Sequence, residues 1–261
     1  MKLELLPLLE IQRDLHTIPP GPARFEAYVK AVTGGGHTIV APLANMNPMG
    51  KEHVAELIDD LLARDAEMLV AEVLAKAENR LGGLEDTLLK KTLQVGLVLT
   101  DDHKGGWTNR YLTDMTQRFK NGYDLEHGWA LVPVWTSQVW TADALEQAVL
   151  STVYRTLYKK VHGLPVTLRE VLKQEGRALH FAGATLVLAS DDLVYSRAVL
   201  EPYKDATEWA VILPCLYGDA AAKAVGHPPL GLSPNAGYAV ALDDARRDAD
   251  PVTALSPLTL S

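Results

Sequence analysis

A short polar segment between two apolar ones holds the side chains best suited to chemistry in this chain. Asp101, Asp102 and His103 follow the apolar run LQVGLVLT and precede the glycine pair Gly105 and Gly106. Carboxylate oxygens are ligands that divalent cations prefer, and an imidazole transfers protons near neutral pH. Glycines let a bound group approach the backbone closely. We therefore expect Asp101 and Asp102 to hold a divalent cation or accept protons, and Asp102 and His103 to act as catalytic acid or base.

The residues that follow supply groups that can hold a small anion. Arg110 stands in the first turn of an expected helix, where a cation opposes the helix dipole unless an anion compensates it. That anion is either a ligand or an internal carboxylate of Asp101, Asp102 or Asp114. Trp107 can stack on a planar ligand, although aromatic residues at helical spacing are more often part of a core. The expected ligand-binding residues are Gly105, Gly106, Trp107, Thr108 and Arg110.

No motif of fixed spacing identifies a reaction. The segment between residues 100 and 110 lacks the GxxxxGK[ST] of a Walker A loop and the GxGxxG of a dinucleotide-binding turn. The chain has neither the HExxH pattern of zinc enzymes nor the GxSxG elbow of serine hydrolases. Cys215, in the apolar context ILPCLYG, is typical of a buried thiol rather than a nucleophile. The alternative interpretation is an ordinary strand-to-helix loop in which Thr108 caps the helix.

The pattern of apolar residues predicts an α/β fold. Leu93–Thr100 is almost wholly apolar, which favours a strand covered on both faces at the centre of the sheet. Further strands are expected at 37–43, 129–136, 184–189, 209–213 and 237–242, and helices at 3–15, 23–32, 107–119, 141–161, 168–179, 193–200 and 219–225. We expect one domain over 1–242, with a mixed or mostly parallel sheet flanked by helices. The C-terminal tail, 243–261, is expected to pack on its own or a neighbouring subunit.

Residues 48–81 predict one long helix. Asn47 is a suitable N-cap, Pro48 suits the first helical position, and apolar residues recur about every 3.6 positions. The charged pair Arg64 and Asp65 is a candidate break midway. Because exposed long helices often pack against a copy of themselves, this helix and the tail together suggest a homo-oligomer.

Three apolar runs end in paired aspartates: GLVLTDD at 96–102, TLVLASDD at 185–192 and YAVALDD at 238–244. If these runs were neighbouring parallel strands, six carboxylates would gather at one edge of the sheet. The alternative is that most of them cap helices or form turns. His127, just before an expected strand, would approach the Asp101 segment if the two strands were neighbours.

Composition narrows the class of protein. A net charge of −8 disfavours a nucleic-acid-binding surface or one that sits on anionic lipid. No apolar run is long enough to span a membrane, and the single cysteine suits a reducing, cytoplasmic compartment. The resulting hypothesis is a site for a small anionic or phosphorylated molecule at residues 100–110, either a binding site or a metal-assisted enzyme site. The alternative is a non-catalytic scaffold protein that assembles through the long helix and the tail.

Overall fold

The chain forms two compact units in a computed structural model that describes residues 2–82, 84, 92–103, 108–186, 188–248 and 250–256. The first unit comprises Met1–Asp114 with Tyr123–Thr152, and the second comprises Met115–Gly122 with Val153–Ser261. The single domain expected over 1–242 stays a prediction.

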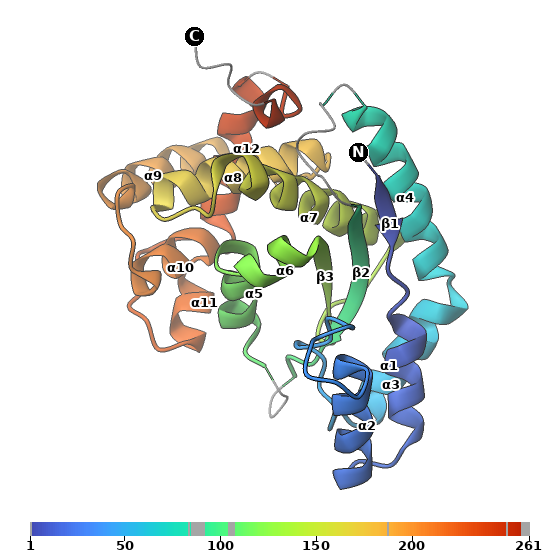
Figure 1. The fold of residues 1–261 in the computed structure, drawn as a ribbon. Helices are drawn as coiled ribbons and strands as arrows, with labels where there is room; N and C mark the ends of the chain where they lie inside the picture. The colour runs from blue at the N-terminus through green and yellow to red at the C-terminus, as the bar shows by residue number, and fades with distance from the viewer. Residues whose placement is uncertain are drawn as a thin grey trace. The chain divides into compact units, whose positions relative to one another are not determined.

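The first unit is built on a parallel sheet with helices around it, which confirms the predicted α/β class (Figure 1). Its strands are β1 (Leu3–Leu5), β2 (Leu93–Thr100) and β3 (Trp129–Trp135), in the order β1-β2-β3. The prediction that β2 is central is therefore also confirmed. Its helices are α1 (Leu9–Thr17), α2 (Pro22–Thr33), α3 (Glu52–Ala63), α4 (Ala66–Leu81) and α6 (Gly122–His127), together with the first parts of α5 (Arg110–Phe119) and α7 (Ala142–His162).

Strand β2 is buried on both faces, as its continuous apolar sequence requires. On one face, Gly96 leaves room for Leu8, because a Cβ at Gly96 would lie 2.7 Å from Leu8 Cδ1. The core on this side gathers buried residues from the helices, loops and strands: Leu8, Leu15, Ala41, Leu43, Met46, Val98, Trp129 and Leu131. This packing fixes the position of β2 against the residues that precede and follow α1.

Gln12 attaches α1 to the edge of β2. β1 pairs with β2 only as far as Leu5, opposite Val95. Beyond that point, the Gln12 amide donates to the Leu97 carbonyl oxygen at 2.9 Å and accepts from the Leu99 N–H at 2.8 Å. A buried side chain therefore satisfies backbone groups that would otherwise lack partners. It also directs the next turn of α1 toward the carboxyl end of the sheet.

The N-terminal predictions were wrong at two places. Residues 3–15 are not one helix, because Leu3–Leu5 joins the sheet as β1 and α1 begins only at Leu9, after Pro7. Residues 37–43 form no strand. The N–H groups of Val40 and Ala41 both donate to the Val32 carbonyl oxygen, so the segment folds back on the end of α2.

The helix predicted over 48–81 is divided in two. α3 begins at Glu52, and the chain breaks at the predicted pair Arg64 and Asp65, where Asp65 adopts a left-handed backbone with φ 52°. Asn47 does not cap a helix at Pro48. Its side-chain oxygen accepts the Met49 N–H in a local turn, and its amide nitrogen donates elsewhere.

The described part of the second unit is helical. It contains the remainders of α5 and α7, then α8 (Leu168–Phe181), α9 (Ser190–Leu200), α10 (Trp209–Tyr217), α11 (Asp219–Ala224) and α12 (Ala236–Arg247), with short 3-10 turns at Glu201–Tyr203 and Thr253–Leu255. α12 packs on α8, α9 and α10. Gly176 in α8 permits one close approach, because a Cβ there would lie 2.1 Å from the Ala241 carbonyl oxygen.

The three strands predicted in this unit were wrong. Residues 209–213 belong to α10, residues 237–242 belong to α12, and 184–186 with 188–189 are irregular. A short apolar run looks the same whether it is a strand or a helix buried on all sides. In α10 every residue from Ile212 to Tyr217 is buried, which removes the periodicity that would have marked it as a helix.

The described tail packs on α7 of its own chain. The Tyr154 hydroxyl donates to the Pro251 carbonyl oxygen at 2.8 Å, His162 Nε2 lies 2.8 Å from the Ala254 oxygen, and Leu255 is fully buried.

No helix formed by the described residues has both the length and the apolar character needed to cross a bilayer.

Candidate functional site

The carboxyl ends of β2 and β3 bring two polar segments together. The strands are parallel and pair up to Thr100 opposite Trp135, and the Thr136 N–H then donates to the Thr100 carbonyl oxygen at 3.2 Å. Asp101 and Asp102 consequently lie beside the residues that follow β3. In α/β proteins this edge is where ligands commonly bind.

Asp101 is a buried carboxylate with four hydrogen-bond donors around it. Its side chain is 3% exposed and accepts from Asn47 Nδ2 at 2.7 Å, His53 Nε2 at 3.0 Å and the Thr136 hydroxyl at 3.2 Å. The His103 N–H adds a longer bond of 3.4 Å. Burial by itself would raise the pKa of Asp101, but the hydrogen bonds from His53 and Asn47 outweigh it and hold the pKa below its usual value. Asp101 is therefore ionised at neutral pH.

His53, in α3, pairs with this carboxylate while part of its ring faces solvent. Its side chain is 37% exposed. Because ionised Asp101 can only accept, His53 Nε2 carries the hydrogen that joins them. In the part of the chain that the structure describes, His53 Nδ1 has no hydrogen-bond partner. The hydrogen bond to Asp101 thus orients the ring through Nε2, as in other carboxylate–histidine pairs.

His103 stands next to His53. The two ring centroids lie 5.2 Å apart with the planes at 82°, an edge-to-face arrangement. His103 is exposed, and its own N–H contacts Asp101. The predicted acid–base residue His103 therefore lies in ring contact with His53.

His16, one turn beyond Gln12 on α1, is a third imidazole at this edge. It is 8% exposed, and its pKa falls to about 4 because burial and the charge of Arg24 disfavour the protonated ring. Arg24 Nη1 lies 3.3 Å from His16 Nδ1 and can only donate, so the neutral ring carries its hydrogen on Nε2. Nε2 is buried and has no acceptor among the described residues.

Arg24, in α2, is a buried cation held by carbonyl oxygens. It is 4% exposed and donates to the backbone oxygens of Ile18 and of Gly50, the latter at 2.9 Å. Burial lowers the pKa of its guanidinium. Within the described residues, Arg24 makes no ion pair with a carboxylate. Its charge therefore favours an anion on this side of the unit.

Asp102 is the second predicted carboxylate, and it organises the segment after β3. Its side chain is buried and accepts from the Ser137 N–H at 2.9 Å and the Ser137 hydroxyl at 2.7 Å, and it shares the single hydroxyl hydrogen of Thr136, at 3.1 Å, with Asp101. Thr136 thus connects Asp102 to Asp101. Because its oxygens are already bonded, Asp102 is better suited to positioning neighbours than to proton transfer.

Arg110 begins α5 beside Asp102. Its Nη1 lies 4.0 Å from Asp102 Oδ2, its Nη2 donates to Gln138 at 3.1 Å, and its guanidinium lies 5.5 Å from the Trp135 ring centre. The side chain stays 39% exposed. An internal carboxylate therefore compensates the charge of Arg110 in part.

The other predicted site residues have different positions. Gly105, Gly106 and Trp107 lie outside the described residues. Thr108 is not the helix cap, because its N–H and hydroxyl both donate to the Asp101 carbonyl oxygen, at 3.2 and 3.0 Å. The cap of α5 is Asn109, whose side-chain oxygen accepts the Leu112 N–H at 3.2 Å.

His127 and the later aspartate pairs do not join this site in the way expected. His127 precedes β3, whereas Asp101 follows β2, so the parallel strands place them at opposite edges. Only the first of the three aspartate pairs ends a strand. Asp192 lies in α9, and Asp243 with Asp244 lies in α12, where both pair with Arg197.

The described residues lend no support to the expected divalent cation. No group of three or more His, Cys, Asp or Glu side chains among them is arranged to hold a metal. The oxygens of Asp101 and Asp102 instead accept hydrogen bonds from their own chain.

Cys215 is a buried thiol, as its apolar sequence context predicts. Burial raises the pKa of this thiol to about 12.

Sequence reasoning missed the residues that complete the site: His16, Arg24, Asn47 and His53. Each lies on an element that precedes β2 in the chain, with no spacing that relates it to Asp101. The available signal was weak: His16 follows the end of the helix predicted over 3–15, and His53 lies near the start of the helix predicted over 48–81.

Comparison of the chain with protein-family models, curated proteins and solved structures finds no match.

Proposed function

We propose that the carboxyl edge of the sheet in the first unit binds a small anionic molecule and transfers a proton to or from it. The observation that carries this proposal is the pair formed by Asp101 and His53. A buried, ionised carboxylate orients a partly exposed imidazole, and the second ring nitrogen has no partner among the described residues. A purely structural histidine has no need of such an arrangement, whereas a general base does.

The charges around this pair favour an anion. Arg110 is partly exposed, and the buried Arg24 has no carboxylate partner among the described residues. His16 adds a buried N–H donor without an acceptor in that part of the chain. A phosphate or carboxylate group accepts from guanidinium and imidazole donors together, which makes it the matching ligand chemistry.

The role that we assign to each residue follows from these contacts. His53 acts as the base, Asp101 orients it, and His103 is the second proton carrier. Arg110 holds the anion, and Asp102 positions Arg110 and the Ser137 segment. Compared with the prediction from sequence, the two aspartates change from metal ligands or proton acceptors to positioning residues.

Thermal unfolding with inorganic phosphate and a panel of small phosphorylated compounds tests the proposal. A ligand that binds only the folded protein stabilises it by about 2.7 kcal/mol at a hundred times its Kd. We expect at least one compound to raise the Tm of the wild type. The variants Arg110→Gln and His53→Gln should lose that rise.

His37→Gln is the matched control, since His37 is an exposed histidine of the same unit. It should respond as the wild type does. If no compound stabilises the wild type, or if the two site variants respond like the control, this edge of the sheet is not an anion site.

A further inference from the structure

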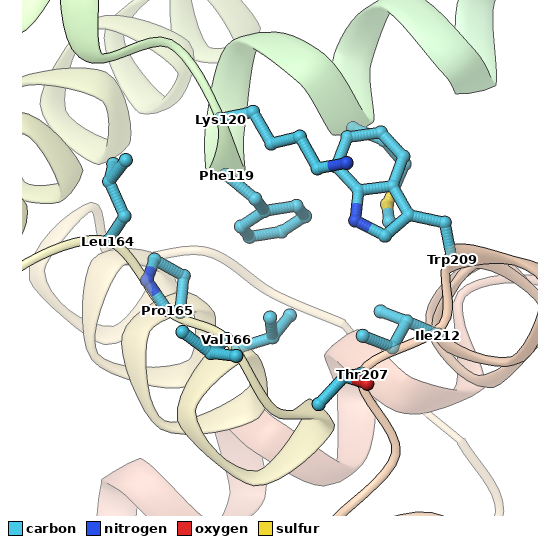
Figure 2. A pocket seen from close by; sticks show the side chains of 10 residues that line it. Phe119, Lys120, Leu164, Pro165, Val166, Thr207, Trp209 and Ile212 are labelled. Carbon is cyan, nitrogen blue, oxygen red and sulfur yellow. The ribbon is translucent and has the colours of Figure 1, made fainter.

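A cavity of about 260 Å³ lies within the second unit (Figure 2). The end of α5, the segment 164–166, α8 and the start of α10 form its walls. The described residues that line it all belong to the second unit, and none of them belongs to the site at the edge of the sheet.

The walls of this cavity are mainly apolar. Phe119, Trp209 and Ile212 point into the space from α5 and α10, and Val166 closes another side (Figure 2). Val166 is 62% exposed and Leu164 is 39% exposed, so apolar side chains continue to the rim. Concave apolar surfaces that remain open to solvent are typical of ligand sites.

Among the described residues that line the cavity, Lys120 is the one cation. The Lys120 ammonium lies 3.8 Å from the centre of the Trp209 ring, a cation–π contact. The residues described around the cavity include no Asp or Glu, and Lys120 forms no ion pair with a described carboxylate. The indole N–H of Trp209 likewise has no acceptor in the described part of the chain. Lys120 is exposed and Trp209 is half-buried, so two donors with no acceptor among the described residues border the apolar space at its solvent side.

We propose that this cavity binds a small apolar carboxylate, such as a medium-chain fatty acid or a single-ring aromatic acid. The apolar body fills the space between Phe119, Val166 and Ile212. The carboxylate accepts from the Lys120 ammonium, which has three hydrogens to donate and keeps its contact with Trp209. Drug-sized ligands fill pockets of about 300 to 1,000 Å³, so this cavity fits a smaller molecule.

The negative charge of the ligand distinguishes a carboxylate from other possible occupants of the cavity. An amine of the same length would place a second cation against Lys120, and an alcohol would gain no charge-assisted bond. A partner's apolar side chain would bind without any requirement for Lys120. Octanoate, octylamine and octanol are therefore suitable probes of equal chain length.

Titration calorimetry of the full chain with the three probes is the test, with Trp209 fluorescence as a second readout. We expect octanoate to bind, and to bind at least tenfold more tightly than octylamine or octanol, because a charge-assisted hydrogen bond is worth about that factor or more.

Three variants at the cavity and one control variant locate the site. Lys120→Met removes the charge at similar length and should weaken octanoate binding about tenfold, whereas Lys120→Arg should retain most of it. Lys173→Met, at an exposed lysine of α8, is the matched control and should bind as the wild type does. Val166→Asp places a carboxylate at the rim and should also weaken binding, with the fold intact because the residue is exposed.

Several results would overturn the proposal. These are no octanoate binding at millimolar concentration, equal binding of octylamine, or unchanged binding by the Lys120→Met variant. A preference for octanol over octanoate would indicate an apolar contact surface for a partner instead.

Discussion

At the scale of single residues, Asp101 connects the site to the stability of the first unit. Four donors converge on its buried carboxylate, and three of them come from segments far away in the chain. A neutral amide in its place cannot accept all of these bonds and presents a donor to others. The side chain thus organises both the fold around β2 and the orientation of His53.

We predict that Asp101→Asn lowers the free energy of unfolding by about 1.5 to 3 kcal/mol, the usual value for hydrogen bonds to a charged group. Urea unfolding at pH 7 measures this change. Asp14→Asn is the control, because Asp14 is exposed, and it should change stability by less than about 0.5 kcal/mol. Equal effects of the two substitutions would contradict the role assigned to Asp101.

His16 predicts a specific loss of stability in mild acid. Its pKa is about 4 in the folded protein and about 6.5 in the unfolded chain, so the unfolded chain binds the proton more readily. The stabilisation due to a neutral His16 is complete above pH 6.5 and declines as the pH falls toward 4. Unfolding measured from pH 7 to pH 4 should show a shallower decline for His16→Gln than for the wild type. Identical pH profiles would contradict a buried neutral His16.

The sequence identified half of this site. Asp101, Asp102, His103 and Arg110 form a local segment whose residue types suggested chemistry, and the structure places them together at the strand end. His53 and His16 could not be found in the same way, because only the packing of α1 against β2 and against α3 brings them there. Local spacing carries no information about such long-range contacts.

At the scale of elements, Glu175 holds three helices of the second unit together. This α8 residue is completely buried and receives two hydrogen bonds from Arg155 of α7, at 2.6 and 3.0 Å, and one from Arg118 of α5, at 2.9 Å. Burial alone would raise the pKa of Glu175, but the charges of the two arginines outweigh it and bring the pKa to about 2. Its contribution to stability is therefore present above pH 4.5 and is lost as the pH falls toward 2.

We predict that Glu175→Gln destabilises the protein by about 3 to 5 kcal/mol at pH 7, because it leaves a buried arginine without its counter-charge. Chemical denaturation measures this loss. Glu201→Gln removes the carboxylate of an exposed pair with Lys204 and should cost less than about 1 kcal/mol. A loss at Glu175 no larger than that at Glu201 would contradict the buried ion-pair network.

The sequence predicted the elements around β2 better than those in the second unit. β2 and β3 were expected almost to the residue, since their apolar runs are followed by polar segments. The sequence predicts strands at 209–213 and 237–242, within α10 and α12, because Trp209–Tyr217 is apolar all round and Ala236–Arg247 is nearly so in its first half. Burial on all sides removes the polar face that distinguishes a helix.

At the scale of the whole molecule, both grounds for expecting self-association have changed. The long helix is divided at Arg64 and Asp65, and the described tail packs on its own α7. The homo-oligomer stays a prediction that light scattering tests directly. A mass of at least two chains would support it, and a mass of one chain, 28.4 kDa, would contradict it.

The central claim is that Asp101 holds His53 with Nδ1 free to act on a bound anion. Nitrogen-15 NMR of the histidine side chains, with and without inorganic phosphate, measures this most directly. The account predicts that neutral His53 carries its hydrogen on Nε2 and that phosphate shifts its Nδ1 resonance, with no shift in an Arg110→Gln variant. A hydrogen on Nδ1, or a His53 resonance that does not respond to phosphate, would contradict it.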